Sequence, residues 1–398
     1  MNIKTVLKLA ITILLAPIIC TLMMITAYSL PVQPMINHAR QSQQVIQHSE
    51  MEQWTGGTHF TSIDYETDFI MAFTAVYPTT SSSIIKDSML NPQYNFTSDF
   101  SDAISNPSIY PRFWHGYVLW LKPLLLCFDF NEIKIFNLFI QIILFSLTLL
   151  SIHSRFGLNT AFAFAFTYFA LNPISNILSL QSALMTITLL SILFLIHNEK
   201  KLFQNDNYLL LFLITGIATS FFEFMTYPLI TLGIPMVIAL LLNKNTKTSN
   251  LWKILILGSI CWTAGYGLFW ASKWIISYLL TGHNTLSDAF SSITQRLGEE
   301  PPSGTYDLSF LSVTHINAYQ IFQPPILLAF GISVVAMIVP QIRKKECRIK
   351  LNIIIPNLFL AIYPLIWFFV VRNHSAIHWW WAHKLFTISL FSIMSLIC

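Results

Sequence analysis

Three acidic residues alternate along a short stretch of the chain. Asp64, Glu66 and Asp68 stand two residues apart, just before the apolar stretch FIMAFTAVY. At the start of a helix that faces a membrane surface, one such carboxylate could act as a base and another could hold a divalent cation. The alternative is a solvated acidic helix cap, because a loop rich in acids produces this spacing by chance.

An arginine and a histidine among aromatic residues form a second candidate. Arg112 and His115 lie in PRFWHGY, which leads into YVLWLKPLLLCF at 117–128, a short segment that predicts an interfacial or re-entrant helix. An arginine at the membrane surface can bind a phosphate while the rings lie at headgroup depth. An ordinary aromatic belt with a snorkelling arginine is the alternative.

The densest polar stretch is RNHSAIHWWWAHK at 372–384. It holds Arg372, His374, His378 and Lys384 beside three consecutive tryptophans. The two histidines, at i and i+4, would share a helix face and could bind a metal, but the stretch lacks the carboxylate of HExxH zinc sites. Anion recognition therefore fits this stretch better than metal binding. A membrane-interface anchor is the alternative, but it would need the tryptophans and not the histidines.

Two charged residues lie within apolar surroundings. Glu223 is in FFEFMTYP between two apolar runs, and Lys273 is in LFWASKWII, between two tryptophans. An ionisable group at membrane depth is costly and marks a cavity or a pairing partner. Lys273 could neutralise a lipid phosphate. Structural pairing of Glu223 and snorkelling of Lys273 are the alternatives.

The amino-acid composition indicates the environment of the elements that carry these residues. Charged residues make up 10% of the 398 residues, against about 25% in soluble domains. This deficit excludes a conventional soluble enzyme, and 14% aromatic residues exclude a disordered chain. The net charge of +4 makes nucleic acid an unsuitable partner, and the five scattered cysteines indicate neither disulfides nor a metal site. No nucleotide-binding motif occurs.

The sequence predicts an all-α, polytopic membrane protein of about ten transmembrane helices. We expect a first transmembrane helix at 1–30, an extracytoplasmic loop with interfacial helices at 31–132, a transmembrane bundle at 133–280, a second extracytoplasmic loop at 281–322 and C-terminal transmembrane helices at 323–398. The ten apolar runs lie at about 8–30, 133–153, 159–173, 181–198, 207–222, 226–243, 252–280, 323–340, 351–371 and 384–398.

The positive charges predict the orientation. With the N-terminus in the cytoplasm, the cytoplasmic loops collect 13 of the 22 lysine and arginine residues, as the positive-inside rule requires. Most acids and histidines then face outward. Outward loops of separate spans can meet only at a shared cavity, which would suit a substrate with an anionic group at the membrane surface.

The chain resembles the GT-C superfamily of integral membrane glycosyltransferases, which use polyprenyl-phosphate or polyprenyl-diphosphate sugars. The shared features are one span followed at once by a large external loop, an acid-x-acid motif in that loop, Glu66-Thr67-Asp68, and about ten spans. The stretches PRFWHGY, FEFMTYPLITLGIP and RNHSAIHWWWAHK also resemble those of uncharacterised bacterial membrane proteins. The resemblance implies transfer of a sugar from a polyprenyl-phosphate donor to an extracytoplasmic glycan or lipid acceptor, in the cell membrane.

The resemblance also implies residue roles. The first-loop acid positions or deprotonates the acceptor and can help to bind a divalent cation, Mg²⁺ or Mn²⁺; this role falls to Asp68, with Glu66 beside it. Basic residues of later outward turns hold the donor phosphate, which points to Arg372, His374, His378 and Lys273. We expect Arg112, His115, Glu223 and Lys384 to complete the substrate site.

Other functions use similar features. A lipid-linked oligosaccharide flippase or transporter would need polar residues through the membrane, and the middle of each predicted span is nearly free of charge. A polysaccharide polymerase or ligase usually has its main external loop late in the chain. A non-catalytic assembly factor would not need Asp68, Glu223, Lys273 and His374 to share one cavity.

Overall fold

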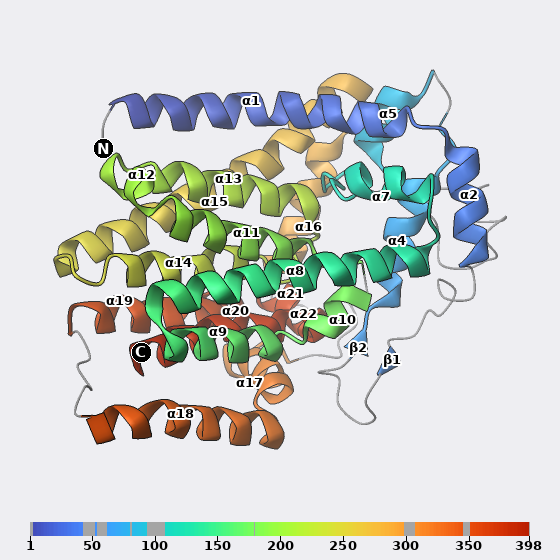
Figure 1. Cartoon of the computed structure of the whole chain (residues 1–398). Coiled ribbons are helices and arrows are strands. Elements are labelled where there is room, and N and C mark those ends of the chain that lie inside the picture. The colour runs from blue at the N-terminus through green and yellow to red at the C-terminus, as the bar shows by residue number, and fades with distance from the viewer. Residues whose placement is uncertain are drawn as a thin grey trace.

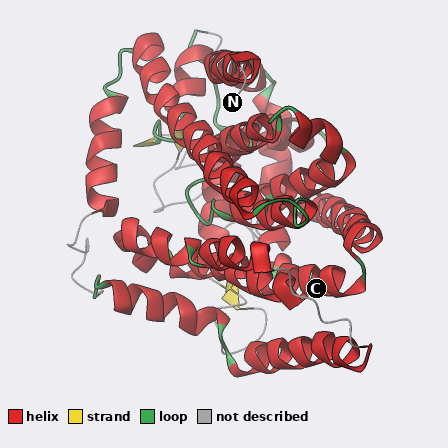
Figure 2. Ribbon diagram, turned by 90° about the vertical axis from the view of Figure 1, so that its left-hand side faces the viewer, coloured by secondary structure: helices red, strands yellow, loops and turns green. Residues whose placement is uncertain are grey.

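The structure is a computed structural model that describes residues 3–42, 52–53, 62–79, 82–93, 108–178, 180–297, 307–344 and 351–397. Helix accounts for most of these residues (Figure 2). Within the described ranges, strands form two antiparallel ladders of two residue pairs each, β1 with β2 and β3 with β4. The predicted all-α class is therefore confirmed.

The first loop contains several short elements after the long α1 (Ile3–Tyr28). They are α2 (Val32–Gln41), β1 (Glu52–Gln53), β2 (Ser62–Ile63), α4 (Tyr65–Val76), α5 (Ile84–Leu90), β3 (Pro92–Gln93), β4 (Ser108–Ile109) and α7 (Val118–Leu125).

The central bundle consists of α8 (Phe130–Phe156), α9 (Leu158–Ala170), α10 (Pro173–Leu178), α11 (Ala183–His197), α12 (Glu199–Gln204), α13 (Tyr208–Phe222), α14 (Ile230–Leu242) and α15 (Thr248–Thr281). The remaining elements are α16 (Thr285–Leu297), α17 (Phe310–Ile321), α18 (Pro324–Lys344), α19 (Leu351–Ala361), α20 (Tyr363–Val370), α21 (Arg372–Ile377), α22 (Trp379–Ala382), the 3₁₀ turns η2 (His383–Leu385) and η3 (Ser395–Ile397), and α23 (Phe386–Met394).

Local signals in the sequence set several helix ends. Asp129 and Glu132 form a reciprocal capping box at the start of α8, which satisfies backbone N–H groups that have no partner within the helix. Helix α15 ends at Gly282, where a φ of +70° suits glycine and reverses the chain into α16. These signals fix where the chain enters and leaves the bundle.

Five helical segments among the described residues are long and apolar enough to cross a membrane: 3–28, 130–156, 248–281, 351–370 and 379–397. The pair α17 and α18, bent by 73°, would make a sixth. Helices α9, α11, α13 and α14 are apolar but have only 13 to 15 residues, and 15 residues rise about 23 Å against a hydrocarbon core of about 30 Å. The long apolar helices indicate a membrane protein, and the count of ten spans stays a prediction.

One segment differs from its expected form. We expected the whole of 372–383 to be a turn between two spans, whereas Trp379 begins the last apolar helical segment, 379–397. The three tryptophans can be part of this helical segment because their large apolar side chains can be buried there.

The elements of the first loop gather at one end of the bundle. Both termini lie at the left end in Figure 1, whereas α2, α4, α10 and the ladder of β1 and β2 lie at the right end. Helices α5 and α15 contact each other, as do α2 and α4 and α4 and α7. This end therefore brings together segments that are far apart in the sequence.

Helices α13 and α15 pack closely against each other. A Cβ atom on Gly216 would overlap the Trp262 carbonyl oxygen, and one on Gly265 would overlap the Leu213 carbonyl oxygen. Small residues let helix backbones approach closely in membrane proteins, where packing rather than water drives association. This contact holds α15, whose Trp270 and Trp274 bind the backbone carbonyl of Arg112, against the bundle.

We predict that Gly265→Ala destabilises the protein by about 1–3 kcal/mol or more, because the added methyl group must push α13 and α15 apart. The melting temperature of the purified protein in detergent measures the effect. Gly267→Ala is the matched control, since a Cβ at this position of the same helix meets no atom within 4 Å. Equal melting temperatures for the two variants would contradict the proposed close packing.

Candidate functional site

A cavity of about 320 Å³ lies where the first loop meets the later turns. Its wall combines acidic, basic, imidazole and aromatic side chains from five separate parts of the chain. They are Asp64, Thr67, Ile70, Tyr110, Phe224, Thr226, Arg296, His374, Ile377, His378, Trp380 and Trp381.

Asp64 is the acid of this cavity, and it caps the N-terminus of α4. Its Oδ1 accepts a hydrogen bond from the Thr67 backbone N–H at 2.9 Å. Its Oδ2 accepts hydrogen bonds from the Thr67 hydroxyl at 2.7 Å, the Trp381 indole N–H at 2.7 Å and the Trp380 indole N–H at 3.4 Å. The donors and the helix N-terminus make a buried carboxylate tolerable.

Asp68, the acid that the sequence favoured, faces another direction. It is buried and pairs through Oδ2 with the Lys134 ammonium of α8 at 3.1 Å, and it does not line the cavity. Burial raises the pKa of Asp68 to about 7, although Lys134 opposes the shift. Glu66 lies in α4, but its side chain is not among those that the structure describes.

Arg296 brings a positive charge to the cavity wall. It comes from the last turn of α16 and its guanidinium lies over the Phe113 ring, 5.4 Å from the centroid. One guanidinium nitrogen donates to the Met225 sulfur at 3.0 Å. Since a thioether is a weak acceptor, the contacts with described residues leave most of the guanidinium's hydrogen-bonding capacity for a ligand.

His374 and His378 face each other in the cavity wall, with ring centroids 4.5 Å apart. His374 donates through Nε2 to the Met225 carbonyl at 2.6 Å, which leaves Nδ1 as the acceptor of a neutral ring. Burial lowers the pKa of His374 well below its usual range and that of His378 to about 4, and Arg296 adds to both shifts. Both imidazoles are therefore neutral at pH 7.

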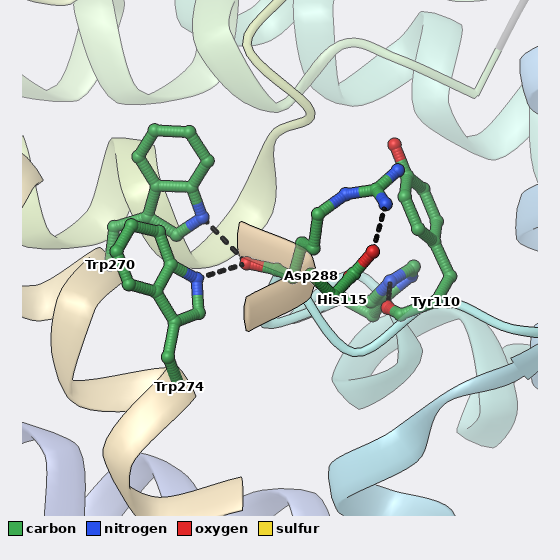
Figure 3. Close-up of polar contacts among 6 residues, drawn as sticks. Tyr110, His115, Trp270, Trp274 and Asp288 are labelled. Carbon is green, nitrogen blue, oxygen red and sulfur yellow. Dashed lines mark hydrogen bonds and ion pairs between the residues drawn. The ribbon is translucent and has the colours of Figure 1, made fainter. Parts of the chain in front are cut away.

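Arg112 and His115 organise the loop beside the cavity (Figure 3). The Arg112 guanidinium pairs with Asp288 of α16 at 2.9 Å. The backbone carbonyl of Arg112 accepts hydrogen bonds from the indole N–H groups of Trp270 at 2.6 Å and Trp274 at 3.0 Å. His115 is buried between the Tyr117 hydroxyl and the Tyr110 carbonyl, each at 2.9 Å. Burial lowers its pKa to about 3.

Lys273 and Lys384 are buried and bonded to other parts of the protein. Lys273 donates to the Met89 carbonyl and the Asn91 side chain, both at 2.8 Å, at the C-terminus of α5. A cation suits that end of a helix, where carbonyl groups lack partners. Lys384 donates to Asn176, and its ammonium lies 4.0 Å from the Trp381 ring centroid. Neither lysine lines the cavity.

Two further predicted residues, Glu223 and Arg372, do not line the cavity. Glu223 accepts hydrogen bonds from the Thr226 backbone N–H at 2.7 Å and from the Tyr266 hydroxyl at 3.1 Å, so it holds the turn after α13. Burial raises the pKa of Glu223 to about 7, against the effect of these bonds. The Arg372 guanidinium lies over the Phe369 ring, 5.5 Å from its centroid, and does not line the cavity.

The structure thus brings together only part of the predicted set. His374 and His378 line the cavity, whereas the other predicted residues with described side chains do not: Asp68, Arg112, His115, Glu223, Lys273, Arg372 and Lys384. Asp64 and Arg296 were not selected from the sequence, although Asp64 carried a signal as the first acid before the helix. In the part of the chain that the structure describes, no three His, Cys, Asp or Glu side chains converge as metal ligands.

Comparisons of the chain with known protein families, with curated proteins and with solved structures find no match.

We predict that His378 makes the fold less stable as the pH falls from about 6.5 to about 4. Its pKa is about 4 when folded and about 6.5 when unfolded, so the unfolded chain binds the proton first and gains stability from it. Above pH 6.5 both states are neutral and the effect vanishes.

Melting temperatures at pH 7 and pH 5 measure this contribution. His378→Gln should lose less stability than the parent protein between the two pH values. His153→Gln, at an exposed site on α8, is the control and should follow the parent. A parallel pH dependence in all three proteins would disprove the assignment.

Proposed function

We propose that this protein is a membrane glycosyltransferase that moves a sugar from a polyprenyl-phosphate donor to an extracytoplasmic glycan or lipid acceptor. The observation that carries the proposal is one cavity that holds the buried carboxylate of Asp64, the guanidinium of Arg296 and the neutral imidazoles of His374 and His378. These are the groups that transfer of a sugar from a phosphate requires.

In the proposed reaction Asp64 accepts the proton of the acceptor hydroxyl. The hydroxyl oxygen then bonds to the anomeric carbon, and the bond from that carbon to the phosphate oxygen breaks. The phosphate leaves with the electron pair, and Arg296 stabilises the charge that develops on it.

The hydrogen bonds of Asp64 suit this role. Three donors bind Oδ2, whereas Oδ1 accepts one hydrogen bond within the described part of the chain. A carboxylate oxygen can accept more than one, so Oδ1 has room for an incoming hydroxyl. The bonds to Oδ2 fix the carboxylate, which lowers the cost of placing it correctly for reaction.

The rest of the cavity wall suits a sugar. The neutral imidazoles of His374 and His378 offer both donors and acceptors to sugar hydroxyls. His378 makes no side-chain hydrogen bond to the described residues and is therefore available to a ligand. Tyr110 and Trp380 supply aromatic faces beside these polar groups.

An apolar groove next to the cavity supports a lipid-linked donor. It has a volume of about 430 Å³ and is lined mainly by side chains of α7, α8, α11 and α13. A smaller pocket shares Phe222 with the groove and Thr226 with the cavity, so the three spaces adjoin. An isoprenoid chain in the groove would place its phosphate towards the polar cavity.

The proposal includes the topology expected from the sequence. The N-terminus is cytoplasmic, about ten spans cross the cell membrane, and the cavity opens on the extracytoplasmic side. Support comes from the positions of both termini at one end of the bundle and α4 at the other (Figure 1). The alternation of cationic loops along the chain agrees with this orientation.

We predict that Asp64→Asn lowers sugar transfer by about 10²–10⁴-fold, the usual contribution of a general base. Asp68→Asn should retain transfer, because Asp68 does not line the cavity. The measurement is mass spectrometry of lipid-linked sugars and surface glycans from cells that carry each variant at equal abundance. Loss of transfer in Asp68→Asn but not in Asp64→Asn would restore the assignment made from sequence.

The same experiment tests the other functions. Cells without the protein should accumulate a polyprenyl-phosphate sugar and lose one sugar from a glycan. An unchanged set of glycans would reject the transferase and favour a role in transport or assembly. Chelation of divalent cations during in vitro transfer tests the metal that the sequence suggested.

A further inference from the structure

Helix α16 carries Arg296, and its other end is bound to the loop beside the cavity. Asp288 in the first turn of α16 pairs with Arg112 at 2.9 Å, and Arg296 in the last turn lies over the Phe113 ring. Asp288 and Arg296 stand at i and i+8, positions that share a helix face. One short segment, Arg112 and Phe113, therefore contacts both ends of the same helix face.

This segment is itself held firmly against α15. The indole N–H groups of Trp270 and Trp274 both donate to the Arg112 carbonyl, as Figure 3 shows, and the Phe113 ring stacks on the Trp270 ring with centroids 5.3 Å apart. The Arg112 side chain also lies over the Tyr110 ring, 4.7 Å from its centroid. The segment is thus a fixed support to which α16 is attached.

We propose that the Arg112–Asp288 ion pair is a positioning pair that holds α16 so that Arg296 faces the anionic group of the substrate. The inference rests on the proposed function, because it takes the cavity to bind a phosphate. Arg112 then acts through α16. Its sequence context had suggested instead that it binds the phosphate directly.

The geometry explains why the pair matters for binding more than for folding. Its side chains are 25% and 35% exposed, and ion pairs of this kind add little to stability. Other contacts also hold α16, including the Trp274 and Phe290 rings, 6.4 Å apart, and packing against α21. A helix is stiff, however, so a shift at Asp288 is carried to Arg296 at its other end, where small misplacements of a charged group reduce its effect.

Binding of farnesyl phosphate to the purified full-length protein tests the proposal. Farnesol is the neutral comparison, and occupancy is reported by the change in intrinsic tryptophan fluorescence, to which Trp380 and Trp381 in the cavity wall contribute. Asp288→Asn and Arg296→Gln should each weaken binding of the phosphate by about 10-fold or more, as loss of a charge-assisted contact does, and leave farnesol unaffected. The exchange of charges in Arg112→Asp with Asp288→Arg should restore most of the affinity.

Glu199→Gln is the matched control, because Glu199 forms a comparable ion pair with Arg155 at 2.8 Å, away from the cavity. It should bind farnesyl phosphate as the parent does. Parent-like binding by Asp288→Asn, or failure of the charge exchange to restore affinity in a folded protein, would overturn the positioning role alone. A parent protein that binds farnesol and farnesyl phosphate equally would overturn the anion site, and with it the proposed function.

Discussion

A buried carboxylate needs hydrogen-bond donors, and this requirement joins the two ends of the chain. Asp64 finds its donors in its own helix α4 and in Trp380 and Trp381, which lie 316 and 317 residues further on. Without the indoles the carboxylate would lose two of its donors in surroundings of low polarity. Helix α21, which carries His374 and is followed by His378, directly precedes these tryptophans, so the same contacts bring the imidazoles to the cavity.

The site is built at interruptions of helices, since within a span every backbone group must be satisfied. Asp64 precedes α4, and Met225 lies in the turn after α13 with a φ of +69°, which is uncommon for a residue other than glycine. Met225 uses this conformation to offer its carbonyl to His374 and its sulfur to Arg296. Backbone strain that is retained at such a place is typical of a functional site.

The sequence predicts the helices better than it predicts the site, for a physical reason. Apolar runs determine helix positions locally, whereas the direction of a side chain depends on the neighbouring elements. Asp64 and Asp68 are four residues apart in the same acidic run, yet one faces the tryptophans and the other faces Lys134 of α8. Sequence spacing could not tell which of the two acids faces the cavity. Arg296 gave no sign of a functional role in the sequence, because charged residues are common in a polar amphipathic helix such as α16.

A lysine in an apolar run was expected to meet an anionic ligand because its burial is costly. The structure offsets this cost with the protein's own dipoles: Lys273 binds the end of α5, and Lys384 binds Asn176 and the face of Trp381. A buried charge therefore indicates that a partner exists without telling whether that partner is a ligand. Arg296 differs because its partners among the described residues are a thioether and an aromatic ring, which leave donors of its guanidinium for an anion.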